Sequence, residues 1–151
     1  MNAAEEIDSL HKELLESING LSEEQLTRPD TFGRWSAREV LLHIAMWIGE
    51  CLKAICVWKT GHDYDWQYAS DYLKYNDFWV KSCEELTVKQ IIQMLNLNLF
   101  ALANELRSIP PDVWSTRGIP DWLQEIAIGH TRGHLQKITL LRHRESSPDQ
   151  P

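Results

Sequence analysis

The chain has 151 residues, a length that suits one domain with a sizeable hydrophobic core. It carries 15 Lys and Arg against 22 Asp and Glu, a net charge of −7 at neutral pH. Nucleic acids and anionic membrane surfaces are bound through basic faces, so this balance argues against both as partners. Hydrophobic residues make up 43% and charged residues 25%, which are values of a globular rather than a disordered chain.

The cysteines and the N-terminal segment indicate the compartment. Cys51, Cys56 and Cys83 show no paired spacing and no C-x-x-C motif, which favours a reducing compartment over a secreted disulfide framework. The first ten residues are acidic and amphipathic, unlike a signal peptide. The most apolar run, from Val40 to Trp58, is interrupted by polar and charged residues. We therefore expect a soluble, cytoplasmic protein with no membrane span.

Three capping boxes mark helix starts, at Ser22, Ser36 and Thr87. In each box, Ser or Thr is followed three residues later by Glu or Gln, and hydrophobic residues flank the box on both sides. Apolar residues spaced three and four apart then predict four main helices. The expected ranges are 3–18, 37–59, 88–107 and 120–142.

The lengths of these four segments indicate how they pack. Helices of this size span roughly 24 to 35 Å at 1.5 Å per residue, so they match one another in a bundle. No segment shows a convincing strand pattern. The sequence predicts an all-α fold, a four-helix bundle, with a single domain over residues 1–144 and a flexible C-terminal tail over residues 145–151.

Residues 60–86 differ from the rest of the chain. They hold all four tyrosines, together with two tryptophans, a phenylalanine and four aspartates. We expect a long aromatic-rich crossover between the second and third helices, with a short helix near Asp71 to Cys83. Such a connection either completes the core or serves as a lid, a binding loop or a dimer surface, and the sequence leaves these readings open.

Three of the six histidines are placed to converge. His130 and His134 lie four residues apart on the apolar face of the fourth helix, and His43 lies at the edge of the apolar stripe of the second. Buried imidazoles need either hydrogen-bonding neighbours or a shared cation, and the pair alone does not decide between them. Three neutral imidazoles suit zinc, nickel or a similar divalent metal and leave a position open for water or substrate. The other three histidines are expected at the surface: His11, His62 and His143.

Two motifs in these helices resemble a known family. The pattern W-S-x-x-E-x-x-x-H-x-x-x-W, over Trp35–Trp47, opens the second helix, and H-x-x-x-H, over His130–His134, lies in the fourth. Together with LSEEQ at Leu21–Gln25, they resemble the DinB/YfiT-like family of metal-binding four-helix bundles. The likeness covers residues 3–143.

The resemblance implies an up-down-down-up bundle, homodimer formation, and metal binding by His43, His130 and His134. Better understood members of the family include transferases and isomerases that act with low-molecular-weight thiols such as bacillithiol, mycothiol or glutathione. The sequence matches the three ligands but shows no signature of a particular substrate.

Five other side chains are possible site residues. Glu50, seven residues after His43, is either a fourth ligand or proton acceptor, or a solvated carboxylate. Lys137 either binds an anionic substrate or extends its ammonium group to the solvent at the rim of the site. Trp47 lines the metal cavity or fills the core. Glu39 is accounted for by its capping box, and Cys51 by burial as a small hydrophobic residue.

These observations favour a metal-dependent enzyme acting on a small molecule. A bound divalent cation lowers the pKa of a water or thiol and so makes a nucleophile at neutral pH. The resemblance to the family implies a thiol S-transferase, and a hydrolase is the second candidate within the enzyme class. The alternative is a non-catalytic bundle that binds a small ligand or is merely stabilised by metal, and a fourth protein ligand would favour it. A third reading makes the three histidines ordinary core residues of an interaction protein.

Overall fold

The computed structural model describes residues 2–146, and all the regular structure in that range is helical. The isolated bridge between Phe32 and Trp35 is too short to make a strand. The four longest α-helices are α1 (Ala3–Ile18), α3 (Ala37–Trp58), α5 (Val88–Arg107) and α7 (Thr131–Ser146). The predicted all-α fold class is confirmed.

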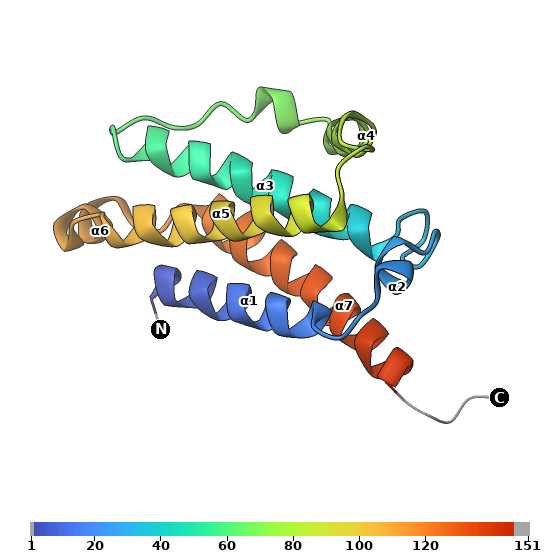
Figure 1. Ribbon diagram of the computed structural model, residues 1–151. Coiled ribbons are helices and arrows are strands. Elements are labelled where there is room, and N and C mark those ends of the chain that lie inside the picture. Colours follow the sequence, from blue (N-terminus) through green and yellow to red (C-terminus); the bar gives the residue numbers. More distant parts are fainter. Residues whose placement is uncertain (1, 147–151) are drawn as a thin grey trace.

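The long helices lie side by side in a bundle. In Figure 1, α1 and α7 run in one direction and α3 and α5 run in the other. Helix α5 packs against both α1 and α3. A π-helical segment, η2 (Leu123–His130), comes directly before α7. Both η2 and α7 also pack against α1 and α3, from the other side. The helices predicted to carry the histidines are therefore neighbours.

The capping boxes form as the sequence predicts. The Ser36 hydroxyl accepts the Glu39 amide at 3.2 Å, and the Glu39 carboxylate accepts the Ser36 amide at 2.7 Å. The same reciprocal pair opens α5 at Thr87 and the short helix α2 (Glu23–Thr27) at Ser22. Because each box fixes the first residue of its helix, the register of α3 at His43 is fixed as well.

Helix α3 is the centre of the hydrophobic core. It is the one described helix that is long and apolar enough to cross a membrane, but 67% of its most apolar window is buried inside the bundle, as in the core helix of a soluble protein. Its fully buried side chains include Leu41, Leu42, Ile44, Ile48 and Ile55. Burial of a side chain of this size contributes about 1.5–3 kcal/mol, so the core alone strongly favours the bundle.

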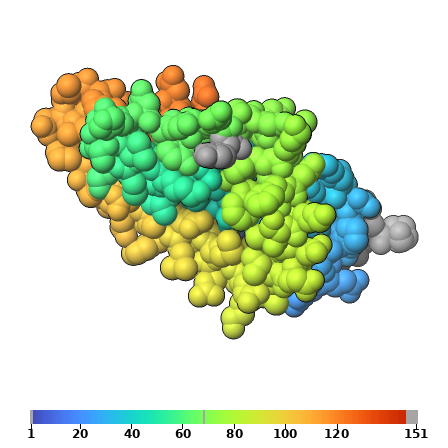
Figure 2. All heavy atoms as spheres, turned by 90° about the horizontal axis from the view of Figure 1, so that it is seen from above, coloured from blue at the N-terminus to red at the C-terminus, as the bar shows by residue number. Residues whose placement is uncertain are grey.

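The crossover between α3 and α5 contains the single-turn helix η1 (Gln67–Ala69) and helix α4 (Tyr72–Ser82), so the short helix expected near Asp71 to Cys83 is present. Helix α4 lies across the bundle and is seen nearly end-on in Figure 1, and Figure 2 shows the crossover spread over α3. None of the residues of α4 is buried. The crossover is held at its far end by Arg38, whose guanidinium donates to the carbonyls of Cys83, Glu84 and Leu86.

Two elements differ from the sequence expectation. After α5 ends at Arg107, Pro111 begins a short helix that the sequence did not predict, α6 (Pro111–Arg117), because proline is favourable in a first helical turn. The predicted fourth helix is divided into η2, with its wider turns, and α7. The apolar periodicity did not reveal that change of pitch.

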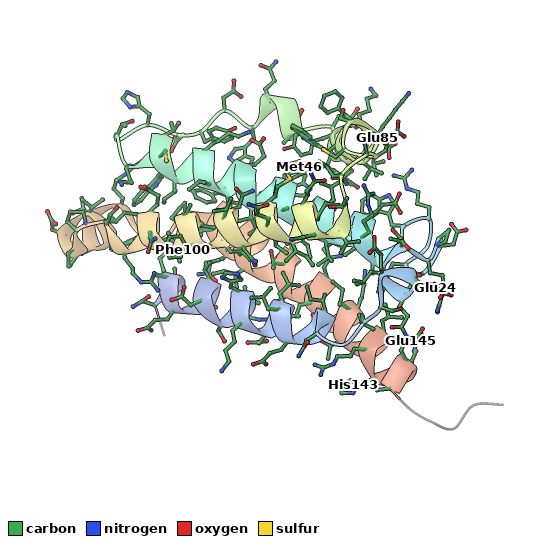
Figure 3. All side chains as sticks on the ribbon, in the orientation of Figure 1. Glu24, Met46, Glu85, Phe100, His143 and Glu145 are labelled. Carbon is green, nitrogen blue, oxygen red and sulfur yellow. The ribbon has the colours of Figure 1, made fainter. Side chains whose placement is uncertain are left out.

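The C-terminal end of α7 packs beside α2 (Figure 3). Residues 145 and 146, assigned to the tail from sequence, belong to α7. The Glu145 carboxylate accepts the Gln25 amide at 2.8 Å and the Arg28 guanidinium at 2.7 Å, which explains why the helix continues. The rest of the expected tail, 147–151, lies outside the described residues.

Candidate metal centre

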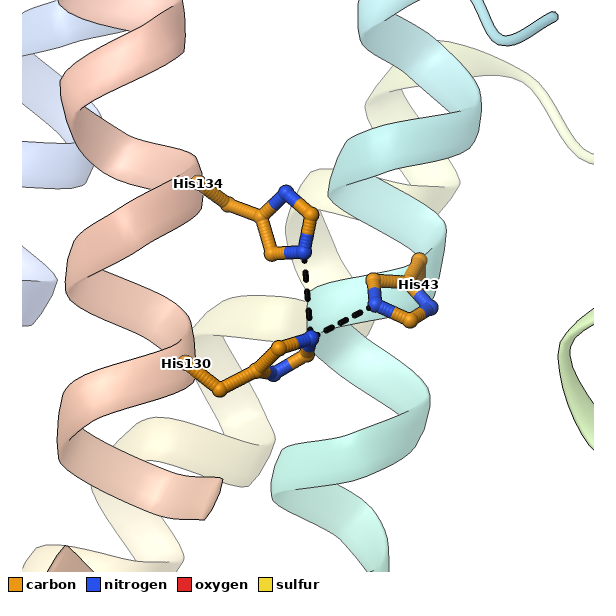
Figure 4. Close-up of side chains that lie close together, drawn as sticks. All are labelled: His43, His130 and His134. Atoms are coloured by element: carbon orange, nitrogen blue, oxygen red, sulfur yellow. Dashed lines mark hydrogen bonds between the residues drawn. The ribbon is translucent and has the colours of Figure 1, made fainter. Parts of the chain in front are cut away.

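The three histidines predicted to converge do so. The Nε2 atoms of His43 and His130 are 2.8 Å apart, and those of His134 and His130 are 3.0 Å apart (Figure 4). Each residue offers a ring nitrogen within 4.8 Å of the other two, so all three point at one small volume between the helices. The arrangement is compatible with one divalent metal ion.

Local helix geometry produces this arrangement. His43 lies seven residues after the Ser36 cap, on the face of α3 that meets η2 and α7. His130 is the last residue of η2 and His134 lies in the first turn of α7, so one helical turn separates them on the same face. A β-carbon added at Gly129 would come within 3.1 Å of the Gln124 carbonyl oxygen, so glycine permits the close backbone of the π-helical segment just before His130. Such segments are frequent at functional sites.

The donor set fits a metal better than it fits hydrogen bonds. A neutral imidazole nitrogen carries one N–H or one lone pair, so His130 Nε2 cannot form a good hydrogen bond with both other rings at once. Two ligands about 2.0–2.1 Å from one ion are separated by roughly 2.9 Å at a right angle and by roughly 3.3 Å in a tetrahedron. The two separations that involve His130, 2.8 and 3.0 Å, are close to the right-angled value.

The second nitrogens of two rings argue against ordinary core histidines. Nδ1 of His130 and Nδ1 of His134 are buried and have no hydrogen-bond partner in the described part of the chain. If these histidines were held in the core by polar neighbours, those atoms are where the neighbours would be found. The rings are instead oriented so that their Nε2 atoms meet.

The electrostatic environment keeps the three rings neutral. Burial, and then the neighbouring His130 and His134, lower the pKa of His43 to about 3, while a side-chain hydrogen bond with Asn76 acts in the opposite direction. Burial, followed by His130 and Lys137, lowers the pKa of His134 to about 4. The pKa of His130 is also lowered, mainly by burial. Neutral imidazole is the form that ligates metals.

The histidines form part of the wall of a cavity of about 550 Å³. Other lining residues come from the segment before α3, from the middle of α3, from the crossover and from η2: Trp35, Trp47, Trp66, Tyr72, Asn76 and Ile126. The ring centroids of Trp35 and His43 are 4.9 Å apart. Trp47 lines the cavity, as one of the two sequence interpretations expected. The sequence did not decide whether the crossover completes the core or forms a binding loop, and in the structure the crossover contributes part of the cavity wall.

Asn76 is a site residue that sequence reasoning missed. Its Oδ1 accepts the Trp47 indole N–H at 3.0 Å, and its side chain hydrogen-bonds with His43. Asn76 comes from α4, which is separated from His43 by the whole second half of α3 and by η1. No sequence signal marks it, because only the folded crossover brings it to α3.

The structure does not bring Glu50 to the histidines. The carboxylate is buried and accepts three hydrogen bonds, from Tyr64 at 2.6 Å, Tyr75 at 2.8 Å and Lys53 at 2.5 Å. Burial alone would raise the pKa of Glu50, but these three hydrogen bonds outweigh it and the pKa is lowered. Glu50 is therefore neither solvated nor part of the three-histidine group; it fastens the crossover to α3.

Lys137 lies on the exposed side of α7 and does not line the cavity, although its charge contributes to the lowered pKa of both His130 and His134. Cys51 is fully buried, and burial raises the pKa of its thiol, as expected of a small hydrophobic core residue.

The remaining histidines are placed nearly as the sequence predicts. His62 and His143 are exposed. His11 is a correction, because it is half-buried and its Nε2 lies 2.8 Å from Asn96 Oδ1 of α5. The apolar residues of α1 predict which face of the helix is buried, but they do not predict this polar contact with α5.

Comparison with known proteins adds the family. No curated protein and no solved structure gives a significant match to this chain. Residues 6–138 match the family model of the DinB superfamily, a span that includes all three histidines and reaches from α1 into α7. This chain belongs to the DinB superfamily.

Proposed function

We propose that this protein is a metal-dependent enzyme that binds a divalent cation, zinc or nickel, through His43, His130 and His134. The observation that carries the proposal is the convergence of three neutral imidazoles on one point. Nitrogen ligands of this kind suit borderline divalent metals.

The position of the histidines favours catalysis over a structural role. Structural zinc sites are closed by four protein ligands, whereas no fourth His, Cys, Asp or Glu joins the group among residues 2–146. The three rings also face a cavity of about 550 Å³, which falls within the range of small-molecule sites, roughly 300–1,000 Å³. A divalent cation held there would lower the pKa of a bound water or thiol and supply a nucleophile at neutral pH.

The residues of the wall favour thiol S-transfer over hydrolysis. In S-transfer, the thiol gives its proton to solvent, its sulfur bonds to an electrophilic carbon, and the leaving group departs with the bonding electron pair. Once the thiol has lost its proton, this reaction needs no general base. Zinc hydrolases of the H-E-x-x-H type use a carboxylate as general base, and none of the described residues lining this cavity is a carboxylate. Hydrolysis is the second candidate, in which His43, His130 and His134 would hold the same cation.

The test of metal binding compares three proteins purified without an affinity tag: wild type, His130→Ala and the control His62→Ala, which removes an exposed loop histidine. Elemental analysis should find about one divalent ion per chain in wild type and in the control, and little in His130→Ala. Equal metal in wild type and His130→Ala would overturn the metal-dependent function.

The test of the reaction uses 1-chloro-2,4-dinitrobenzene with a series of thiols, followed by absorbance of the conjugate. Wild type should accelerate conjugation, chelation should abolish the acceleration, and added zinc should restore it. If the protein retains its metal but accelerates no thiol, S-transfer is excluded and hydrolysis or simple ligand binding takes its place.

A further inference from the structure

The wall of the cavity beside the histidines is aromatic and uncharged. Trp35 and Trp47 stand on the α3 side, Trp66 and Tyr72 on the crossover side, and Ile126 on η2. None of the described lining residues is Asp, Glu, Lys or Arg. Asn76 is the one amide among them, and its Oδ1 already accepts the Trp47 indole N–H.

The basic groups on the surrounding surface do not enter the cavity. Arg34 is paired with Asp77 at 2.6 Å, and Lys53 is paired with Glu50. Lys137 follows His134 by one turn, but it is exposed and does not line the wall. A carboxylate at the end of the cavity away from the ion held by the histidines would therefore lose water without gaining a positively charged side chain, which is unfavourable.

Aromatic walls also attract cations, so a positively charged ligand has to be considered. Two features oppose it. The wall offers no carboxylate in its described residues, and the divalent ion of the proposed function would repel a second positive charge at short range. Hydrophilic thiols such as glutathione carry charged groups of both signs, and no charged side chain of the described wall pairs with either.

We propose that the cavity takes a neutral, largely aromatic molecule with one metal-binding head, of the class of arylalkyl thiols and their uncharged electrophilic partners. This inference rests on the proposed function, because the metal-binding head has to meet the ion held by His43, His130 and His134. The three tryptophan rings and Tyr72 provide flat apolar surface for the aryl body.

The test is a set of matched thiols that differ only in charge. Benzyl mercaptan, its 4-carboxy derivative and its 4-(trimethylammonio) derivative are titrated into the zinc-loaded protein by calorimetry. We expect benzyl mercaptan to bind at least ten-fold more tightly than either charged analogue. Equal or tighter binding of the carboxylate or of the cation, or no binding of any thiol, would overturn the inference.

A charge added to the wall should change this preference. Tyr72 and Phe78 both lie on α4 and are similarly exposed, at 59% and 60%. Of the two, only Tyr72 lines the cavity. Tyr72→Lys should improve binding of the 4-carboxy analogue relative to benzyl mercaptan by at least five-fold, and Phe78→Lys should leave the ratio unchanged. An equal effect of the two substitutions, or no effect of Tyr72→Lys, would show that the aryl body does not occupy this cavity.

The same titrations separate this inference from the proposed function. If benzyl mercaptan is preferred with and without zinc to the same extent, the cavity has the proposed preference but the metal takes no part, and the proposed function fails. If zinc is bound by the three histidines but a charged analogue is preferred, the metal site stands and the neutral aromatic substrate is excluded.

Discussion

The hydroxyl of Tyr75 in α4 donates to Oε1 of Glu50 in α3 at 2.8 Å, across the face on which the crossover lies. Tyr64 donates to the other oxygen of the same carboxylate at 2.6 Å. The Tyr75 ring also packs against Trp47, with ring centroids 5.0 Å apart, and Trp47 lines the cavity beside the histidines. A carboxylate that does not join the histidines therefore determines where one wall of their cavity stands.

Glu50→Gln should destabilise the protein by about 1–3 kcal/mol, because the amide gives up charge-assisted hydrogen bonds in a buried setting. Urea unfolding at pH 7 measures the change as a lower midpoint. The control is Glu125→Gln on η2, where the side chain is exposed and a change within about 0.5 kcal/mol is expected. Equal midpoints for the two variants would show that the carboxylate does not fasten the crossover.

The same residue predicts a pH dependence. The pKa of Glu50 in the folded protein is lower than its ordinary value, so the ionised carboxylate stabilises the fold above the unfolded pKa of about 4.3. That contribution is lost as the pH falls through the lower folded pKa. The stability difference between wild type and Glu50→Gln should therefore be largest near pH 7 and shrink toward pH 3. A difference that stays constant over this range contradicts the assignment.

Asn76→Ala should weaken metal binding without removing a ligand. Loss of a partner that orients a ligating histidine typically costs about 10–100-fold in metal affinity, and Asn76 hydrogen-bonds with His43. Competition with a chromogenic chelator measures the affinity. Asn96→Ala is the matched control, because Asn96 contacts His11 between α5 and α1, and it should leave the metal affinity unchanged.

Two glycines that flank the histidine pair should respond differently to alanine. Gly133→Ala meets nothing within 4 Å, so the better helix propensity of alanine should stabilise the protein by up to about 1 kcal/mol. Gly129→Ala brings a β-carbon to 3.1 Å from the Gln124 carbonyl oxygen, and the backbone must shift. Thermal unfolding should show a higher midpoint for Gly133→Ala than for Gly129→Ala, and metal affinity should fall only in the latter. The reverse order would mean that the π-helical segment does not need glycine.

Removal of the metal should lower stability without unfolding the bundle. The core of α1, α3, α5 and α7 is built from buried apolar side chains that do not depend on the site. A ligand present at 100 times its dissociation constant stabilises the fold by about 2.7 kcal/mol, so a chelator should lower the thermal midpoint while the circular dichroism at 20 °C stays helical. Loss of helical signal on chelation would favour the reading of a metal-stabilised, non-catalytic bundle.

Much of this structure could be predicted from local sequence signals. Capping boxes and apolar spacing located the helix starts at residues 37 and 88, because both signals depend on a few consecutive residues. The convergence of His43 with His130 and His134 was predictable because neighbouring bundle helices bring their apolar faces together, and all three rings lie on or beside those faces.

The features that escaped prediction depend on contacts between distant segments. Asn76 and Tyr75 are ordinary polar and aromatic residues of a connection, and only the folded crossover places them on Trp47 and Glu50. The π-helical turns of η2 leave the apolar pattern almost unchanged, so periodicity cannot distinguish them from an α-helix. The partial burial of His11 likewise comes from Asn96 of another helix.

Helix α4 contributes Tyr72 and Asn76 to the cavity but buries none of its residues, whereas the histidines stand on helices whose cores are complete without it. Part of the cavity wall is thus encoded in a helix that contributes no buried residue to the core. The exposed positions of α4 could be randomised in a selection for new ligands, with Tyr64 and Tyr75 kept on Glu50, while the helices that hold the three imidazoles keep their packing. The same arrangement gives natural variation in α4 a route to new substrates that leaves the core side chains of the bundle in place.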